Sequence, residues 1–455
     1  MKQIILLVTA LALLATSCQK ENQVSNKVTL EVYADSLFKT SIDSAQIAGA
    51  AILVFQKDKM LLNKSYGYAS LELSTPMPEN AIFDIGSVTK QFTAAAILKL
   101  VEANKLSLDD DFTKYLEFDT KGRKITIAQL LDHTSGMEAD MGKEIEFFDM
   151  LTNQGLPHNS IAKMFKPKDF MFEPGEALIY NNNAYSYLGL IIEKVTGQSY
   201  EDYLKETFFK PLGMKSTSFG SNTKVTKNKV NGYRYDSLGI QQKPYLNYNL
   251  PYSAGSLSSS TQDLLTWMTA LHQAKILSVA TYESMITPGQ LNDGSKLQYA
   301  KALENYSDFG NHKIGHTGGF SGFMTDTRYY PEEALYIICL VNTSGGPKNA
   351  TFFAEQITWQ LLDKKTPQNI ALDIDTALLE GLYTGPTRGN YNDSIQVKSI
   401  TGGMIIQKAK SNKIDTLRTY IGNDTWAKGN NRIMIKNNEY RDIQPGAYYI
   451  LKKVK

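Results

Sequence analysis

The sequence predicts an α/β (α+β type) domain whose sheet is built from both ends of the domain, followed by a small all-β domain. Strand-like segments occur early, at 49–70, and again late, at 313–342, and few strand signals occur over 109–175. That middle stretch therefore predicts a helical insertion. After Lys364-Lys365-Thr366-Pro367, short alternating segments rich in Gly, Asn and Tyr favour a sandwich or barrel over about 370–455.

The N-terminus has the pattern of an export signal. Met1-Lys2 precedes an apolar stretch over 4–15, which is too short to span a bilayer as a stable helix. Ala15-Thr16-Ser17-Cys18 then resembles a bacterial lipoprotein cleavage site; an ordinary signal peptide with an incidental cysteine is the alternative. We expect a signal peptide over 1–18, lipid chains on Cys18, and a flexible polar tether over 19–30. This predicts a protein held at a membrane of the bacterial cell envelope, facing the periplasm or the cell surface.

The larger domain, 31–365, is expected to begin with a helix over 31–46. A hairpin follows over 49–70, turning at Lys57-Asp58-Lys59. Apolar spacing predicts helices over 91–104, 185–196 and 261–271, the first of them buried. Strands are expected at 313–315, 323–330 and 334–342, before a last helix capped by Asn349.

Composition excludes several classes of function. The chain of 455 residues carries 48 basic and 46 acidic side chains, a net charge of +2, so no basic face for nucleic acid is implied. The five histidines form no cluster with Cys or Asp at metal-ligand spacing, and we expect no metal and no cofactor. Cys339 lies in an apolar run and is expected to be a small buried hydrophobe, with no disulfide to Cys18.

Ser87-Val88-Thr89-Lys90 is the first candidate for chemistry. It lies between an apolar lead-in and a helix, and a serine and a lysine three residues apart share one helix face. An amine is thereby placed beside a hydroxyl that alone is too weak an acid to attack a carbonyl. The pattern Ser-x-x-Lys nevertheless occurs five times, so the assignment requires partners. The other four pairs are Ser17/Lys20, Ser36/Lys39, Ser160/Lys163 and Ser221/Lys224.

Tyr180-Asn181-Asn182 is the second candidate, directly before a predicted helix. A tyrosine titrates near pH ~10, but a neighbouring lysine favours its phenolate and makes it a usable base. Asn182 is expected to point at the same cavity and donate to a substrate carbonyl.

His316-Thr317-Gly318-Gly319 is the third, at the end of a short predicted strand. Consecutive glycines on a strand are costly unless a ligand or backbone must approach closely. This pattern favours an extended substrate along the strand edge, with the Ser87 and Gly319 amides forming an oxyanion hole.

Taken in order, these three motifs resemble the β-lactamase-related serine hydrolases, which include class C β-lactamases, D-alanyl-D-alanine carboxypeptidases, D-aminopeptidases and esterases. The segments 83–94, 130–137 and 174–175, around these motifs, also resemble that family, and the resemblance covers about residues 30–365. It implies a β-lactamase/transpeptidase-like antiparallel sheet flanked by helices, with a helical insertion.

The resemblance also implies roles. Ser87 would be the acylated nucleophile, Lys90 would assist its deprotonation, and Tyr180 would carry the proton to the leaving group. Whether Lys90 or Tyr180 is the acylation base stays open, and the two are expected to titrate as a coupled pair. The substrate would contact the remaining motif residues, Asn182, His316, Thr317, Gly318 and Gly319.

One departure bears on the substrate. His316 stands where class C β-lactamases typically have a lysine, and a neutral imidazole is a weaker site for an anion at pH 7. We therefore expect hydrolysis of an amide or ester, such as a D-amino-acid peptide or a small ester. The alternatives are a penicillin-binding sensor or pseudoenzyme that acylates without turnover, and a true class C-like β-lactamase. His133 and Asp84, near these motifs, are expected to act structurally.

Overall fold

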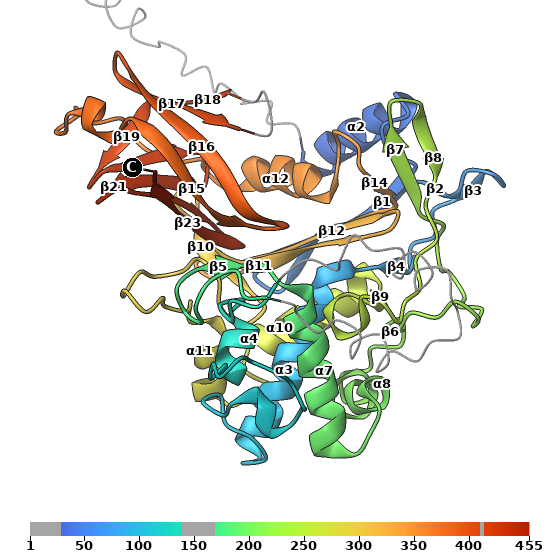
Figure 1. Ribbon diagram of the computed structural model, residues 1–455. Coiled ribbons are helices and arrows are strands. Elements are labelled where there is room, and N and C mark those ends of the chain that lie inside the picture. Colours follow the sequence, from blue (N-terminus) through green and yellow to red (C-terminus); the bar gives the residue numbers. More distant parts are fainter. Residues whose placement is uncertain (1–28, 139–168, 410–413, 455) are drawn as a thin grey trace, which may run out of the picture.

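The computed structural model describes residues 29–138, 169–409 and 414–454 (Figure 1). The predicted signal peptide, Cys18 and most of the tether lie outside the described residues, as does 139–168 of the predicted insertion. Within the described ranges, no helix is both long and apolar enough to cross a membrane.

A seven-stranded antiparallel sheet forms the centre of the larger domain, in the order β10-β11-β12-β13-β1-β2-β3. Strand β1 pairs with β13, so an early and a late part of the chain meet in the middle of the sheet, as predicted. The hairpin between β1 and β2 turns at Lys57 and Asp58, both in the left-handed region (φ 48° and 60°). The strands are β1 Gly49–Gln56, β2 Lys59–Ser70, β3 Thr75–Pro76, β10 Glu304–Asp308, β11 Asn311–Phe320, β12 Phe323–Tyr330 and β13 Leu335–Val341.

Helices cover both faces of this sheet (Figure 1). On one face, α2 (Leu30–Asp43) and α12 (Ala350–Leu361) pack together, and Phe38 stacks on Tyr66 and on Phe353 at 4.5 and 4.3 Å. The opposite face carries the larger core, in which Phe92 of α3 stacks on Trp267 of α10 at 3.9 Å. The helices on that side are α3 Thr89–Glu102, α4 Ile127–Leu131, α7 Asn182–Thr196, α8 Tyr200–Leu204, α9 Lys210–Leu212, α10 Thr261–His272 and α11 Val279–Ile286.

Short elements complete the domain. A 3₁₀ turn, η1 (Gly86–Val88), leads into α3, and a second, η4 (Tyr252–Ala254), lies beside α3 and α7. Two small sheets have the strand orders β4-β9-β6 and β14-β7-β8. Their strands are β4 Phe83–Asp84, β6 Ser218–Phe219, β7 Tyr233–Asp236, β8 Gly239–Gln242, β9 Leu257–Ser259 and β14 Thr343–Ser344; η2 Phe112–Lys114, η3 Lys205–Phe209 (a π-helical turn) and η5 Thr376–Leu379 are the other turns.

The C-terminal domain is a barrel-like antiparallel sheet in the order β18-β17-β16-β15-β23-β22-β21-β20-β19. Trp426, Tyr383 and Tyr440 are among the buried side chains of its core. The predicted fold class, an α/β domain followed by an all-β domain, is confirmed. The strands are β15 Gly381–Thr387, β16 Asn390–Ile400, β17 Gly403–Lys408, β18 Ile414–Leu417, β19 Thr419–Gly422, β20 Thr425–Lys428, β21 Asn431–Lys436, β22 Glu439–Gln444 and β23 Ala447–Lys453.

A strand pairing that no sequence pattern predicts joins the two domains. Strand β5 (Leu178–Ile179) belongs to the larger domain by sequence, but it pairs with β23, Ile179 opposite Ala447 and Leu178 opposite Tyr448. An apolar cluster of Leu178, Leu291, Leu297, Tyr299 and Tyr448 lies across this boundary. The last strand of the chain is therefore joined to the segment that leads into Tyr180.

Strand β11 is longer than predicted. The sequence places a strand over 313–315 and His316 at its end, whereas β11 continues to Phe320. Strand β12 pairs with it through Gly318 and Gly319 as far as Phe320 opposite Phe323. Backbone hydrogen bonding from β12 thus outweighs the poor strand propensity of the two glycines.

Candidate active site

Ser87 lies at the start of the central helix, where the backbone of β11 comes very close. Gly86 has φ +52°, and a methyl group on it would lie 2.6 Å from the Gly319 nitrogen. A methyl group on Gly318 would lie 2.0 Å from the Ile85 carbonyl oxygen. Only glycine permits this contact, which explains why glycines occur at both positions. The Ser87 side chain is half-buried and remains accessible.

Lys90 lies in α3, one helical turn after Ser87, and is fully buried. Three oxygen atoms contact its amine. Nζ lies 3.2 Å from Ser87 Oγ, 2.9 Å from Asn182 Oδ1 and 2.6 Å from the Ala254 carbonyl oxygen. Burial, with a smaller contribution from the positive charge of Arg388, holds the pKa of Lys90 well below its usual range. The amine is thereby biased toward its neutral form, which can accept a proton.

Tyr180 and Asn182 lie at the start of α7: Asn182 is its first residue, and Tyr180 comes two residues earlier. Asn181 caps this helix by accepting from the Ala184 amide, and its own amide donates to His133 Nδ1 at 3.1 Å. His133 is buried with φ 60°, and its ring centroid lies 4.3 Å from that of Tyr180. The expected structural role of His133 agrees with this geometry, because its ring supports the segment that presents Tyr180.

Tyr180 differs from the sequence expectation in its protonation. A neighbouring lysine is expected to favour the phenolate, but burial raises the pKa of the Tyr180 phenol above its ordinary value. Ser87 and the guanidinium of Arg388 act on this pKa in the opposite direction and do not overcome burial. The correction follows from Lys90, which cannot stabilise a phenolate while its own charge is disfavoured.

His316 lies on β11 and is buried. Nδ1 donates to the Thr317 carbonyl oxygen at 2.5 Å, and Nε2 accepts from the Tyr299 hydroxyl at 3.0 Å. Both ring nitrogens are thus satisfied in the neutral imidazole. Burial lowers the pKa of His316 to about 4, although the carboxylate of Glu304 acts to raise it. The expectation of a largely neutral side chain at this position agrees with the structure.

The edge of β11 facing Ser87 is open beyond Gly315. Strand β10 pairs only with residues 311–315, so no described strand covers the following segment, which includes Thr317, Gly318 and Gly319. Thr317 is half-buried and Gly319 is exposed. An extended chain can pair with such an edge. The close approach of the Gly86 and Gly319 backbones brings the segments of the two predicted oxyanion donors, the Ser87 and Gly319 amides, together.

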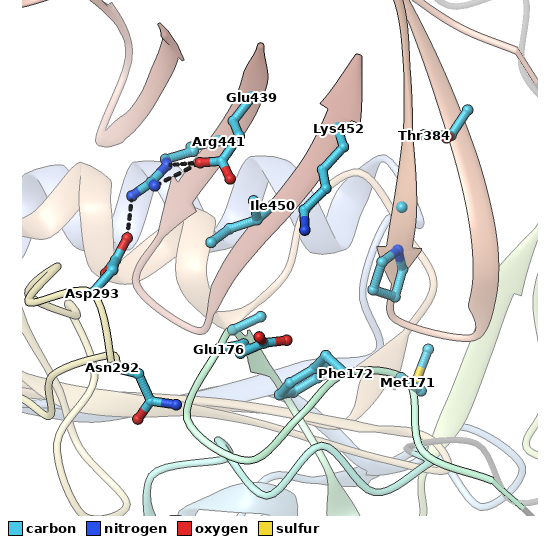
Figure 2. A pocket seen from close by; sticks show the side chains of 13 residues that line it. Met171, Phe172, Glu176, Asn292, Asp293, Thr384, Glu439, Arg441, Ile450 and Lys452 are labelled. Atoms are coloured by element: carbon cyan, nitrogen blue, oxygen red, sulfur yellow. Dashed lines mark hydrogen bonds and ion pairs between the residues drawn. The ribbon is translucent and has the colours of Figure 1, made fainter. Parts of the chain in front are cut away.

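A residue of the C-terminal domain also contacts the candidate site, which the sequence did not indicate. Arg388, at the turn between β15 and β16, lies with its guanidinium carbon 4.9 Å from the centroid of the Tyr180 ring. A cavity of about 570 Å³ lies between the two domains, and its lining includes Pro386 of β15, the strand that leads into the Arg388 turn. Figure 2 shows its lining, with Arg441 joined to Glu439 and Asp293 on one side and Phe172 on the other.

Neither of the other two Ser-x-x-Lys pairs that the structure describes has a comparable set of partners. Ser36 and Lys39 are exposed on α2, where Lys39 pairs with Asp43 at 2.8 Å. Ser221 accepts from the Lys224 amide at 3.0 Å in a loop, while Ser17/Lys20 and Ser160/Lys163 lie outside the described residues. The part of the chain that the structure describes contains no group of acidic, His and Cys side chains that would hold a metal ion.

Comparison with known proteins agrees with this geometry. The family described as Beta-lactamase matches residues 34–357. Penicillin-binding protein 4* of Bacillus subtilis is 30% identical over 338 residues, which cover 68% of this chain and 71% of that protein. The octameric penicillin-binding protein homologue of Pyrococcus abyssi has a TM-score of 0.64 at 27% identity, covering 92% of this chain and 99% of that one.

A D-amino acid amidase from Ochrobactrum anthropi shares the fold, with a TM-score of 0.62 at 19% identity over 73% of this chain and 96% of that one. The family match spans most of the larger domain, including Ser87, Tyr180 and His316. The chain therefore belongs to the β-lactamase family, the serine hydrolases of the β-lactamase and penicillin-binding type.

Proposed function

We propose that this protein hydrolyses an amide or ester through an acyl-enzyme on Ser87. The observation that supports this most directly is the buried amine of Lys90, 3.2 Å from Ser87 Oγ. A neutral amine at this distance is a competent general base for a serine hydroxyl. Asn182 and the Ala254 carbonyl hold the amine in place by accepting from it.

In the proposed reaction, Ser87 Oγ gives its proton to Lys90 Nζ and bonds to the substrate carbonyl carbon. The carbonyl oxygen becomes an oxyanion and accepts hydrogen bonds from the Ser87 and Gly319 amides. The bond to the leaving amine or alcohol then breaks, and that group takes a proton from the Tyr180 hydroxyl. Lys90 returns its proton to Tyr180, and water then hydrolyses the acyl-enzyme with Lys90 and Tyr180 in the reverse roles. This assigns the acylation base to Lys90.

We propose a D-amino-acid peptide or a small ester as the substrate. Relatives named as a penicillin-binding protein and a D-amino acid amidase support this class. The neutral state of His316 favours these substrates over antibiotics, because it offers no permanent cation on β11 beside Ser87. A class C-like β-lactamase activity is therefore the less favoured reading.

We further propose that the protein acts in the bacterial cell envelope, anchored through lipid on Cys18. The apolar N-terminal stretch and the small residues before Cys18 support this.

Labelling separates the hydrolase from the alternatives. The full-length protein and Ser87→Ala are treated with a fluorophosphonate and with a fluorescent penicillin, and bound label is followed over hours. We expect labelling of the wild type only, decay of the penicillin label, and turnover of D-Ala-D-Ala peptides or p-nitrophenyl esters. A penicillin label that never decays, without any turnover, would instead support a sensor. Equal labelling of Ser87→Ala would refute the assignment of the nucleophile.

A further inference from the structure

The hairpin between β15 and β16 is a well-defined structure at the boundary of the two domains. Thr387 pairs with Asn390, so Arg388 and Gly389 form the turn, and Gly389 has φ +74°. The Thr387 hydroxyl donates to Asp393 at 3.0 Å, which fastens the end of the hairpin. The turn therefore holds the Arg388 backbone in a fixed place relative to the sheet of the C-terminal domain.

Arg388 and Lys90 both contact Tyr180, although they come from different domains. The guanidinium carbon of Arg388 and Nζ of Lys90 each lie 4.9 Å from the centroid of the Tyr180 ring. The pairing of β5 with β23 fixes this arrangement, because Tyr180 directly follows Ile179, which lies opposite Ala447. The C-terminal domain thus forms one side of the catalytic cluster, by which we mean Ser87, Lys90 and Tyr180 with the side chains around them.

Charge distinguishes Arg388 from the other basic groups of the cluster. Burial disfavours the charged forms of Lys90, His133 and His316 by lowering their pKa values. Lys313, also buried, is paired with Glu304 at 3.3 Å. A guanidinium stays charged at any physiological pH. Within 29–138, 169–409 and 414–454, no carboxylate forms an ion pair with Arg388.

Arg388 is accessible to solvent, and its neighbours in sequence lie at the interdomain cavity. The Arg388 side chain is exposed, and the interdomain cavity is lined by Pro386, two residues before it, and by Ala177, three residues before Tyr180. The walls of the cavity come from both domains (Figure 2).

We propose that Arg388 binds a carboxylate of the substrate, so that the C-terminal domain supplies the anion-recognition group of the active site. This inference rests on the proposed function and narrows its substrate to amides or esters with a free carboxylate. Arg388 lies over Tyr180, the proposed proton donor to the leaving group, which places the carboxylate on the leaving-group side. The favoured reaction is release of a C-terminal amino acid, with the guanidinium donating two parallel, charge-assisted hydrogen bonds to the carboxylate.

A binding experiment tests this without requiring turnover. Full-length Ser87→Ala, which cannot be acylated, is titrated with N-acetyl-Lys-D-Ala-D-Ala and with the same peptide as its C-terminal carboxamide. We expect the acid to bind 10-fold or more tighter than the amide, in line with about 1.5–3 kcal/mol for a charged hydrogen bond. Arg388→Gln in the same background should remove this preference, and Arg388→Lys should restore part of it.

Arg418→Gln is the matched control, because Arg418 is an exposed arginine of the same domain between β18 and β19. It should leave the preference for the acid unchanged. Equal affinity for acid and amide, no binding of either peptide, or a preference that survives Arg388→Gln would overturn the inference. An equal loss of affinity for both peptides in Arg388→Gln would also overturn it, and would indicate that Arg388 acts as a contact between the domains. Failure of the proposed function appears separately, as absent fluorophosphonate labelling of Ser87.

Discussion

Ile179 pairs with Ala447 across the domain boundary, one residue before Tyr180. The terminal strand of the C-terminal domain thereby holds the segment that carries a proposed catalytic side chain. In this chain the C-terminal domain contributes to the active site through its backbone at β23 and through Arg388 at the β15–β16 turn.

A destabilising substitution at the domain boundary should impair catalysis more than an equally destabilising substitution elsewhere. Leu178→Ala removes a buried side chain from the cluster between the domains, and we expect it to cost about 2–5 kcal/mol of unfolding free energy. Leu417→Ala removes the same side chain from the core of the C-terminal domain. At a temperature where both variants are folded, kcat should fall for Leu178→Ala and stay near wild type for Leu417→Ala. Equal kcat values would show that β5 does not position Tyr180.

Acylation of Ser87 should require Lys90 as an amine that can lose its proton. Lys90→Arg places a permanently charged guanidinium at this position, which cannot act as a base, so we expect acylation of Ser87 by a fluorophosphonate to slow by about 10²–10⁴-fold. Because burial lowers the pKa of Lys90, the acid limb of the wild-type rate profile should lie well below the ordinary lysine pKa. An acid limb near pH ~10 would contradict a buried neutral amine.

Tyr180→Phe should impair proton transfer while leaving the ring in place. We expect hydrolysis of an amide to slow by at least ~10²-fold, because its leaving group must be protonated. A p-nitrophenyl ester should be affected much less, since its leaving group departs as an anion. The ratio of the two losses, measured as kcat/KM, checks the assignment, and equal losses would point to a role in acylation itself.

His316 should make the native state less stable in acid. Its folded pKa of about 4 lies below the ordinary value of 6.5, so below pH 6.5 the unfolded chain takes up a proton that the native chain does not. Stability linked to this group is therefore fully present above pH 6.5 and is lost as the pH falls toward 4. Relative to His316→Gln, wild type should lose about 2 kcal/mol of unfolding free energy between pH 7 and 5.

Urea unfolding of both proteins at each pH measures this difference directly. Asp132 is also buried, with a pKa raised to about 6, and its linkage has the opposite sign. Because Asp132 is present in both proteins, its contribution cancels in the comparison. A difference that does not change with pH would show that His316 is not held neutral.

Cys18 should decide where the protein resides. Cys18→Ser is expected to move the protein from the membrane fraction to the soluble fraction of a bacterial host, because lipid chains would supply the anchoring energy. Mass spectrometry of the wild-type N-terminus should find Cys18 acylated as the first residue. An unmodified N-terminus cleaved elsewhere would favour an ordinary signal peptide.

Local sequence patterns were sufficient for most of the elements. Helix α10 begins at Thr261 with Ser260 as its cap, and β12 occupies Phe323–Tyr330, both as the periodicity and capping residues indicate. The same local rules could not predict β11 beyond Gly315, since its glycines are held by the neighbouring strand β12. They also could not predict β5, whose two residues are a strand only because β23 lies beside them.

The sequence by itself determined the fold class, the order of the motifs at Ser87, Tyr180 and His316, and the family to which they point. Those features depend on short-range periodicity and on side-chain identity, which one chain displays directly. Only the tertiary structure decided the direction in which the pKa values of Lys90 and Tyr180 shift and the presence of Arg388 beside Tyr180. Burial and long-range contact set those properties, because desolvation depends on everything that surrounds a group rather than on its neighbours in sequence.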